Sequence, residues 1–285
     1  NIQTNLAAMA RLQGQLSSGK RITVPSDDPA AAGQAMHLRA TGRQLDQYAR
    51  NATDGDSWLT TVDTALTTTL SSLRNARDLV VQSGDAGLGQ ASRNALADNI
   101  DGLRDGILAQ ANTKYMGRTV FAGTSDAGTA YTVDTADPAN PLYTWTGAPG
   151  AGVERRIGPT TLVRVDADGS QAFGNGADSV FSLLTDISND LRAGVPVTDR
   201  LTDIDSRMQK LLAVASANGS TQKVVESMQS DLASQSLTVT SQLSGVEDID
   251  MPDVIMRLQL QEVTYQGALS AGARVLQPTL LDFLR

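Results

Sequence analysis

A short segment near the amino end has the residue spacing of a phosphate-binding loop. Gly14, Gly19 and Lys20 stand where the pattern G-x-x-x-x-G-K-[ST] places its glycines and its phosphate-contacting lysine. Arg21, however, occupies the position that needs a Ser or Thr hydroxyl for magnesium. Such a loop also follows a buried strand, whereas the residues before Gly14 have helical periodicity. We therefore interpret the segment as the loop that closes a helix.

An acidic run in the middle of the chain begins like a calcium-binding loop. Asp166, Asp168 and Gly169 fit the start of that pattern, but Gln171 and Ala177 fill the positions that need Gly and Glu. We interpret this run as a β-turn.

The remaining residues that could do chemistry lack partners in the sequence. His37 is the only histidine, and we interpret it as a surface residue of a helix. Seven methionines fall mostly in helical stretches, where they are expected to fill gaps at helix seams. The chain has no cysteine, which excludes disulfides and thiolate metal sites. The sequence therefore predicts no catalytic, cofactor-binding or metal site, and we expect that the protein is not an enzyme.

Charge and hydropathy exclude two further classes of partner. The formal charge is −8, which disfavours nucleic acid because neutralising phosphates needs a basic surface. The sequence has no apolar run of the roughly eighteen residues that a membrane span requires, and no Sec-type signal is visible. Aromatic residues make up only 4%, which favours long helix seams built from aliphatic side chains over a large globular core.

The stretch 197–243 predicts one long helix around which other helices must pack. Its apolar residues alternate at spacings of four and three, which is the register of a narrow buried seam. The seam weakens at Asn218 and Gln222, beside Gly219. At about 1.5 Å per residue this helix would be about 70 Å long, so helices of similar length must cover it.

Further helical patterns occupy both sides of this stretch. A short amphipathic helix is expected from Ile2 to about Ser17, and a second, capped by Asp28, from Pro29 toward Tyr48. The polar segment 51–56 then predicts a break. The other expected helices follow at 59–83, 96–111, 180–191 and from Asp250 to near the end.

Between these helical segments, in the middle of the chain, the spacing of the apolar residues changes to every second position. Segments around Tyr131–Val133, Leu142–Trp145 and Thr161–Val165 alternate as strands do, and glycine is concentrated in the same region. The predicted fold is mainly α: an elongated helical bundle with coiled-coil-like termini and a small inserted β-rich domain. We divide it into terminal assembly helices (1–22 plus 250–285), a helical rod (23–115 plus 177–249) and a β-rich outer domain (116–176).

Both ends of the chain carry a family resemblance. Leu16–Ile22 followed by Ser26–Ala32 resembles the amino-terminal signature of bacterial flagellins and their hook-associated relatives. Leu243–Asp250, Tyr265–Leu269 and Leu280–Leu284 resemble the carboxyl-terminal segment of the same superfamily. Within it, Asp27–Pro29 and the run Met116–Thr124 are more similar to members that join hook to filament than to members that form the filament.

The resemblance implies an extracellular structural adaptor at the junction of hook and filament, exported unfolded through the flagellar type III apparatus. The implied partners are copies of itself in a ring, the other hook-associated protein, flagellin, and a cytoplasmic export chaperone at the C-terminal segment. Two alternatives stay open, namely filament flagellin itself and a different secreted helical type III component.

The apolar stripes of the terminal helices are the expected assembly surface, because a terminal helix with an apolar stripe cannot bury it alone. Its expected residues are Leu6, Met9, Leu16, Leu258, Tyr265, Leu269, Leu276, Leu280, Leu281, Phe283 and Leu284.

Overall fold

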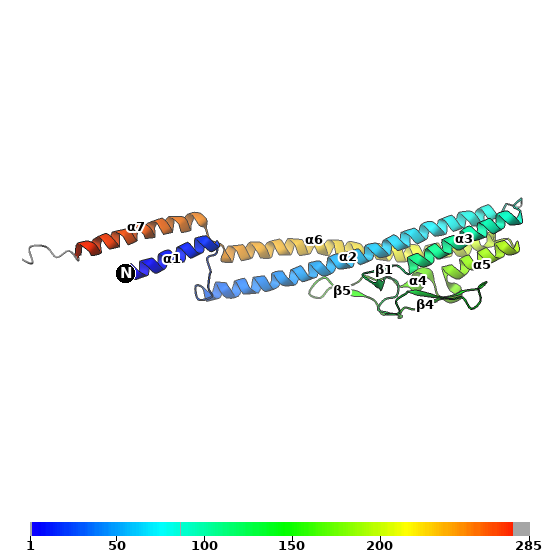
Figure 1. Cartoon of the computed structure of the whole chain (residues 1–285), viewed down its shortest axis with the longest axis horizontal. Coiled ribbons are helices and arrows are strands. Elements are labelled where there is room, and N and C mark those ends of the chain that lie inside the picture. The colour runs from blue at the N-terminus through cyan, green and yellow to red at the C-terminus, as the bar shows by residue number, and fades with distance from the viewer. Residues whose placement is uncertain (1, 86, 276–285) are drawn as a thin grey trace, which may run out of the picture. The chain divides into compact units, whose positions relative to one another are not determined.

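The computed structural model describes residues 2–85 and 87–275, and most of them are in long helices (Figure 1). The elements group into two compact units, residues 1–46 with 233–285 (unit 1) and residues 47–232 (unit 2). The helices are α1 (Ile2–Ser18), α2 (Pro29–Ser83), α3 (Gln90–Ala111), α4 (Gly169–Phe173), α5 (Val180–Ala193), α6 (Leu201–Glu247) and α7 (Met251–Val275).

Six short strands lie between α3 and α4 and form three separate two-stranded antiparallel sheets. They are β1 (Lys114–Tyr115) with β2 (Arg118–Thr119), β3 (Tyr131–Asp134) with β4 (Leu142–Trp145), and β5 (Glu154–Arg156) with β6 (Leu162–Arg164). The predicted fold class, long helices with a small β-rich insert, is confirmed.

The apolar seam of α6 is present with the predicted spacing. Ile204, Leu211, Val225 and Leu232 along it are all at most 2% exposed. The helix begins four residues later than predicted, because Thr198–Arg200 form a 3₁₀ turn first, and it ends at Glu247. Asn218, where we expected the seam to weaken, is buried, and its side-chain amide donates to the Leu59 carbonyl of α2 at 3.1 Å. The polar interruption is therefore a specific contact between the two long helices.

The break predicted at 51–56 is wrong, because α2 continues through this segment without interruption. Its polar side chains contact the β-rich insert instead of ending the helix. Asn51 Nδ2 donates to the Arg156 carbonyl at 2.7 Å, and the Asp54 carboxylate accepts from Tyr115 Oη at 3.2 Å and from Arg155 Nε at 2.6 Å. A Cβ at Gly55 would lie 3.1 Å from Val165 Cγ1, so the glycine allows close packing of the insert on α2.

The insert has an aromatic core that it shares with α5. Phe121 and Phe173 meet edge to face at 5.0 Å, and both Tyr131 and Tyr143 pack against Phe181 of α5. Burial raises the pKa of Tyr131, which keeps its hydroxyl protonated. That hydroxyl lies within hydrogen-bond distance of the carbonyls of Gly169 and Gly174. The insert is thus fixed to the helices through both apolar and polar contacts.

The acidic run at 166–169 is not the predicted β-turn. Asp168 caps α4 by accepting from the Ser170 amide at 2.9 Å, and Asp166 is buried, where it pairs with Arg164 at 2.9 Å and accepts from the Val153 amide at 2.7 Å. Asp168 has the extended backbone that a helix N-cap requires. Both carboxylates therefore serve local structure.

The β-rich region offers a test of the three-part domain division, which stays a prediction. We expect that replacing 116–176 with a short Gly-Ser link keeps the helical content but lowers the midpoint of thermal unfolding, because Trp58 loses the Arg155 guanidinium over its ring and Phe181 loses its stacked partner Phe173. Far-ultraviolet circular dichroism measures both quantities. A general loss of helicity in this variant would contradict the domain boundary.

Candidate assembly site

The terminal helices α1 and α7 pack against each other within unit 1 (Figure 1). The least exposed positions of α7 recur at spacings of four and three, from Val254 through Leu258, Gln261, Tyr265 and Ala268. Gln261 Nε2 donates to the Asn5 carbonyl of α1 at 3.5 Å. Only Val254 of this stripe is fully buried, so a pair of helices covers the seam incompletely.

The predicted assembly residues divide into three groups. Met9 and Leu16 of α1, and Leu258 and Tyr265 of α7, are half-buried. Leu6 and Leu269 remain exposed, at 42% and 44%. The others lie outside the described residues: Leu276, Leu280, Leu281, Phe283 and Leu284.

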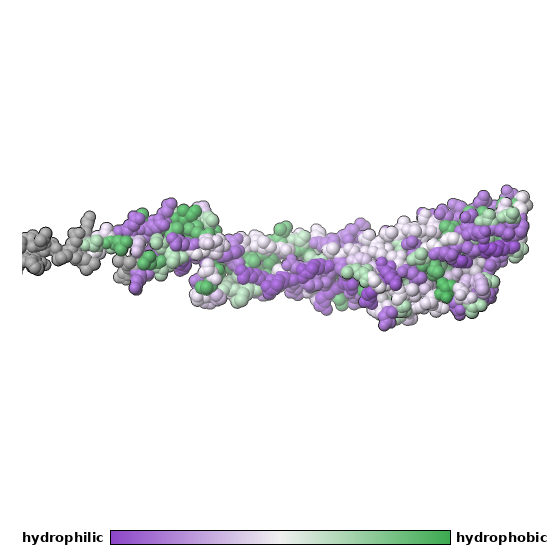
Figure 2. All heavy atoms as spheres, viewed as in Figure 1, coloured by the Kyte–Doolittle hydropathy of each residue, from purple (hydrophilic) through white to green (hydrophobic). Residues whose placement is uncertain are grey.

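A second apolar stripe on α7 was missed by the sequence analysis. Met256, Leu260 and Val263 are 63%, 67% and 66% exposed, and they follow one another at spacings of four and three. Figure 2 shows hydrophobic surface on the outside of α7 near its amino-terminal end. The spacing of this stripe is visible in the sequence, but the predicted assembly surface on this helix includes only Leu258, Tyr265, Leu269 and Leu276.

The two signature segments at the chain ends meet in a short backbone pairing, which we call the terminal bridge (residues 19–21 with 247–249). Lys20 and Asp248 form an antiparallel bridge. The Arg21 amide donates to the Glu247 carbonyl, and the Ile249 amide donates to the Gly19 carbonyl at 3.2 Å. Gly19 has a φ of +69°, the left-handed conformation in which a helix commonly ends.

Charged side chains reinforce the terminal bridge. Glu247 is only 4% exposed and accepts from Arg39 Nη2 at 2.8 Å, while Lys20 Nζ lies 3.5 Å from its carboxylate. Lys20 Nζ also donates to Asp248 Oδ1 at 2.6 Å. This hydrogen bond, followed by one from Ser244, holds the pKa of Asp248 below its usual value, and the same bond to Asp248 raises the pKa of Lys20. The bridge is a charge-assisted connection between residues more than 200 positions apart.

The terminal bridge also decides between the interpretations of the phosphate-loop pattern. Gly14 lies inside α1, which ends at Ser18, and Lys20 is occupied by two carboxylates. The interpretation as a loop that closes a helix is confirmed. His37 is exposed, as predicted. The prediction that helical methionines fill gaps at helix seams is wrong for Met36, Met251 and Met256, which are exposed.

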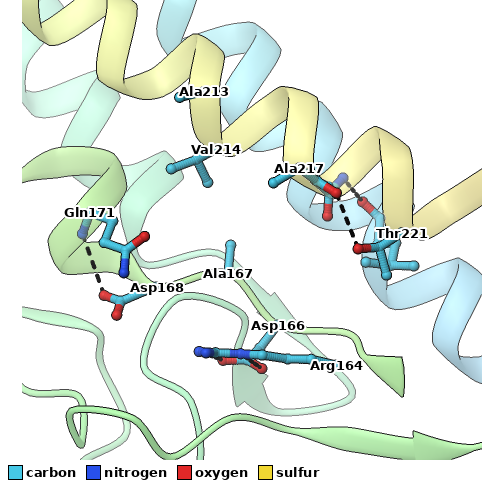
Figure 3. A pocket seen from close by; sticks show the side chains of 11 residues that line it. Arg164, Asp166, Ala167, Asp168, Gln171, Ala213, Val214, Ala217 and Thr221 are labelled. Carbon is cyan, nitrogen blue, oxygen red and sulfur yellow. Dashed lines mark hydrogen bonds and ion pairs between the residues drawn. The ribbon is translucent and has the colours of Figure 1, made fainter. Parts of the chain in front are cut away.

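The hollow in Figure 3 lies in unit 2, between α6 and the β-rich insert, and has a volume of about 300 Å³. Its apolar wall includes Leu59, Val214 and Ala217, and its polar wall holds Arg164 and Asp166, which pair with each other.

Among the described residues, no cluster of His, Cys, Asp or Glu could hold a metal ion. Within residues 2–85 and 87–275, no helix is long and apolar enough to span a bilayer.

Comparison with known proteins gives the class of the chain. The N-terminal helical region of bacterial flagellin matches residues 1–126, and the C-terminal helical region of bacterial flagellin matches residues 201–284. Together these regions include the terminal bridge and both terminal helices. The chain belongs to the bacterial flagellin superfamily.

Individual relatives show which members of this superfamily the chain is similar to. The chain is similar to flagellar hook-associated protein 3 of Escherichia coli K12, with 26% identity over 90% of this chain and 87% of that protein. Flagellin of Bacillus subtilis 168 is 27% identical over 100% of this chain and 95% of that protein. The flagellar junction protein FlgL from Legionella pneumophila superposes with a TM-score of 0.61, covering 74% of this chain and 100% of that one at 15% identity, which supports the fold.

We expect that Glu247→Ala destabilises the terminal bridge by about 1 to 3 kcal/mol, because a buried carboxylate that two cations share is removed. Amide hydrogen exchange at Arg21 and Ile249 measures this locally. Glu226→Ala, at an exposed position of the same helix, is the matched control. Unchanged protection of both amides in Glu247→Ala would show that the side chain does not support the bridge.

The terminal bridge should also weaken in acid. Because the pKa of Asp248 is lowered in the folded protein, its contribution is present above the unfolded-state pKa near about 4 and is lost as the pH falls through the folded value. We expect protection factors at Ile249 to fall as the pH drops below about 5, and to fall less in Asp248→Asn. An identical pH profile for both proteins would contradict the assignment.

Proposed function

We propose that the chain is a structural adaptor of the bacterial flagellum that joins the hook-associated proteins to the flagellin filament. Its copies assemble as a ring between the other hook-associated protein and flagellin, after export through the flagellar type III apparatus to the cell exterior. The protein acts by assembly and not by catalysis. Family membership and the incompletely covered terminal helices support this proposal.

The observation that favours a junction protein over a filament protein is the run Met116–Thr124, which resembles the junction members of the family. In the structure this run forms the β1–β2 turn and supplies Val120 and Phe121 to the core of the insert, where both are fully buried. Similarity to hook-associated protein 3 along 87% of that protein supports the same choice. Filament flagellin is the second candidate, because the match to the Bacillus subtilis flagellin is longer, over 100% of this chain and 95% of that protein.

We assign assembly to the terminal helices. The half-buried stripe of α1 and α7, which includes Met9, Leu16, Leu258 and Tyr265, would be fully covered only by further helices. Leu6, Leu269 and the second stripe of α7 would then contact neighbouring subunits. The expected residues at 276–284 lie outside the described part of the chain and stay a prediction for the assembly surface, which a cytoplasmic chaperone would cover before export in a helix-in-groove mode.

Imaging of isolated hooks and filaments with an antibody to this chain tests the function. An adaptor is labelled only at the junction of hook and filament, and its deletion leaves hooks that carry no filament. Label along the whole filament would identify the chain as filament flagellin and reject the adaptor role.

We expect Leu269→Ser together with Leu276→Ser to weaken junction assembly and chaperone binding. Losing two apolar side chains from a buried interface would remove about 2 to 4 kcal/mol of association free energy. Filament attachment and chaperone titration measure the two effects. Leu212→Ser, at a leucine of similar exposure on α6, is the control. Normal filament attachment by the double variant would reject the assigned surface, and unchanged chaperone affinity would reject the chaperone contact.

A further inference from the structure

The turn between β1 and β2 presents an apolar side chain flanked by cations. Met116 is 81% exposed, and Lys114 and Arg118 on either side of it are exposed as well. Among the residues that the structure describes, neither cation forms an ion pair or a side-chain hydrogen bond. Unit 2, to which this tip belongs, has 15 basic and 22 acidic side chains, a formal charge of −7. The tip (residues 114–118) is therefore cationic on an acidic body.

The backbone of the tip is strained for the residue it carries. Tyr115 pairs with Arg118, which leaves Met116 and Gly117 as a two-residue loop with φ angles of +48° and +83°. Such a loop favours Asn or Gly at its first position. A methionine there has an unfavourable backbone conformation and exposes its side chain to water. Strain combined with apolar exposure is typical of a binding position.

The base of the tip is rigid. Tyr115 packs its ring 5.4 Å from that of Trp58 and donates its hydroxyl to Asp54, both on α2. Thr119 is 4% exposed, and Val120 after it is fully buried. The tip is therefore held in place before it meets a partner, which lowers the entropy lost on binding.

A groove of complementary character lies between α2 and α3. It has a volume of about 500 Å³ and is lined by Asn75, Asp78, Leu79, Asn99, Gly102 and Leu103. Leu79 and Leu103 are half-buried, and a Cβ built on Gly102 would meet no atom within 4 Å, so an apolar side chain has room to enter. Asp78 is exposed and has no ion pair within the described part of the chain. Two cations lie nearby on α2: Arg77, which interacts electrostatically with Asp78 but forms its ion pair with Asp205, and the exposed Arg74, one turn earlier.

The tip cannot fill the groove of its own chain. From Gly102 to the end of α3 at Ala111 the helix rises about 14 Å, and the tip follows after that point on its rigid base. The occupant must therefore come from another molecule, and this chain itself supplies a tip of matching charge. Because the tip and the groove are different surfaces, such a contact is heterologous and repeats from copy to copy in a ring or a helical array.

We propose that the tip of one copy docks into the α2–α3 groove of a second copy, with Met116 between Leu79 and Leu103 and Arg118 facing Asp78. This contact deepens the proposed function, because it supplies a lateral connection between subunits outside the terminal helices. It does not require the terminal helices to be assembled.

Charge reversal tests the pairing. In sedimentation velocity of the purified full chain over a range of concentrations, Arg118→Glu and Asp78→Arg should each weaken self-association about tenfold or more. The double variant should recover most of that loss, because it restores an opposite-charge pair. Additive weakening in the double variant would overturn the pairing, and so would unchanged association in both single variants.

Cysteine cross-linking gives a second measurement. The chain has no natural cysteine, so only the introduced cysteines can form a disulfide. Chains with Met116→Cys are mixed with chains with Asn99→Cys and mildly oxidised. The disulfide between these two variants should form faster than a disulfide between either variant and chains with Thr64→Cys. Thr64 is an exposed control position on α2. Cross-linking at the control rate would overturn the proposal.

These outcomes separate the docking contact from the proposed function. If the mixed dimer is absent while antibody still labels only the junction, the docking is wrong and the adaptor role stands. If the mixed dimer forms while antibody labels whole filaments, the docking stands and the adaptor role fails.

Discussion

The apolar seam of α6 is the constraint on which the rest of the structure depends. A helix of 47 residues cannot bury a stripe that repeats along its length without other helices beside it. The 55-residue α2 is one of these helices, and it stays helical through a segment of weak helix formers because that segment has tertiary partners. In unit 2, α3 and α5 also pack against each other, and their residues Ile100, Ile107, Leu184 and Ile187 are all fully buried.

Polar contacts fix how the long helices align. An apolar seam alone tolerates sliding by a heptad, whereas a buried amide has one place where its hydrogen bond is satisfied. Asn218 finds that place at the Leu59 carbonyl, and Arg77 pairs with Asp205 at 2.8 Å further along the same two helices. The terminal bridge fixes the alignment of the two chain ends in the same way, because Glu247 is buried there and pairs with both Lys20 and Arg39. These contacts supply specificity more than net stability.

The two units differ in how completely they bury their apolar surface, and this difference suits a subunit that orders on assembly. Unit 2 has a closed aromatic and aliphatic core. The terminal helices of unit 1 leave their shared stripe half-buried and carry a second exposed stripe at Met256, Leu260 and Val263. Under the proposed function, such a terminal helix pair would gain most of its stability from neighbouring molecules, which would couple folding of the ends to assembly.

Periodicity by itself determined the long helices, the β-rich insert and the seam of α6, because these depend on local spacing of apolar residues. Residue type at the helix start, an Asp followed by Pro29, also predicted the cap Asp28, whose side chain accepts from the Ala31 amide. Only the tertiary structure decided that α2 continues through 51–56, since Asn51 and Asp54 are satisfied by residues about 60 to 105 positions away. The tertiary structure also showed that Asp166 forms a buried ion pair and that Asp168 caps a helix. It further showed that Met116 is exposed at a strained turn. Such long-range partners leave no trace in local spacing, because the chain must fold before they meet.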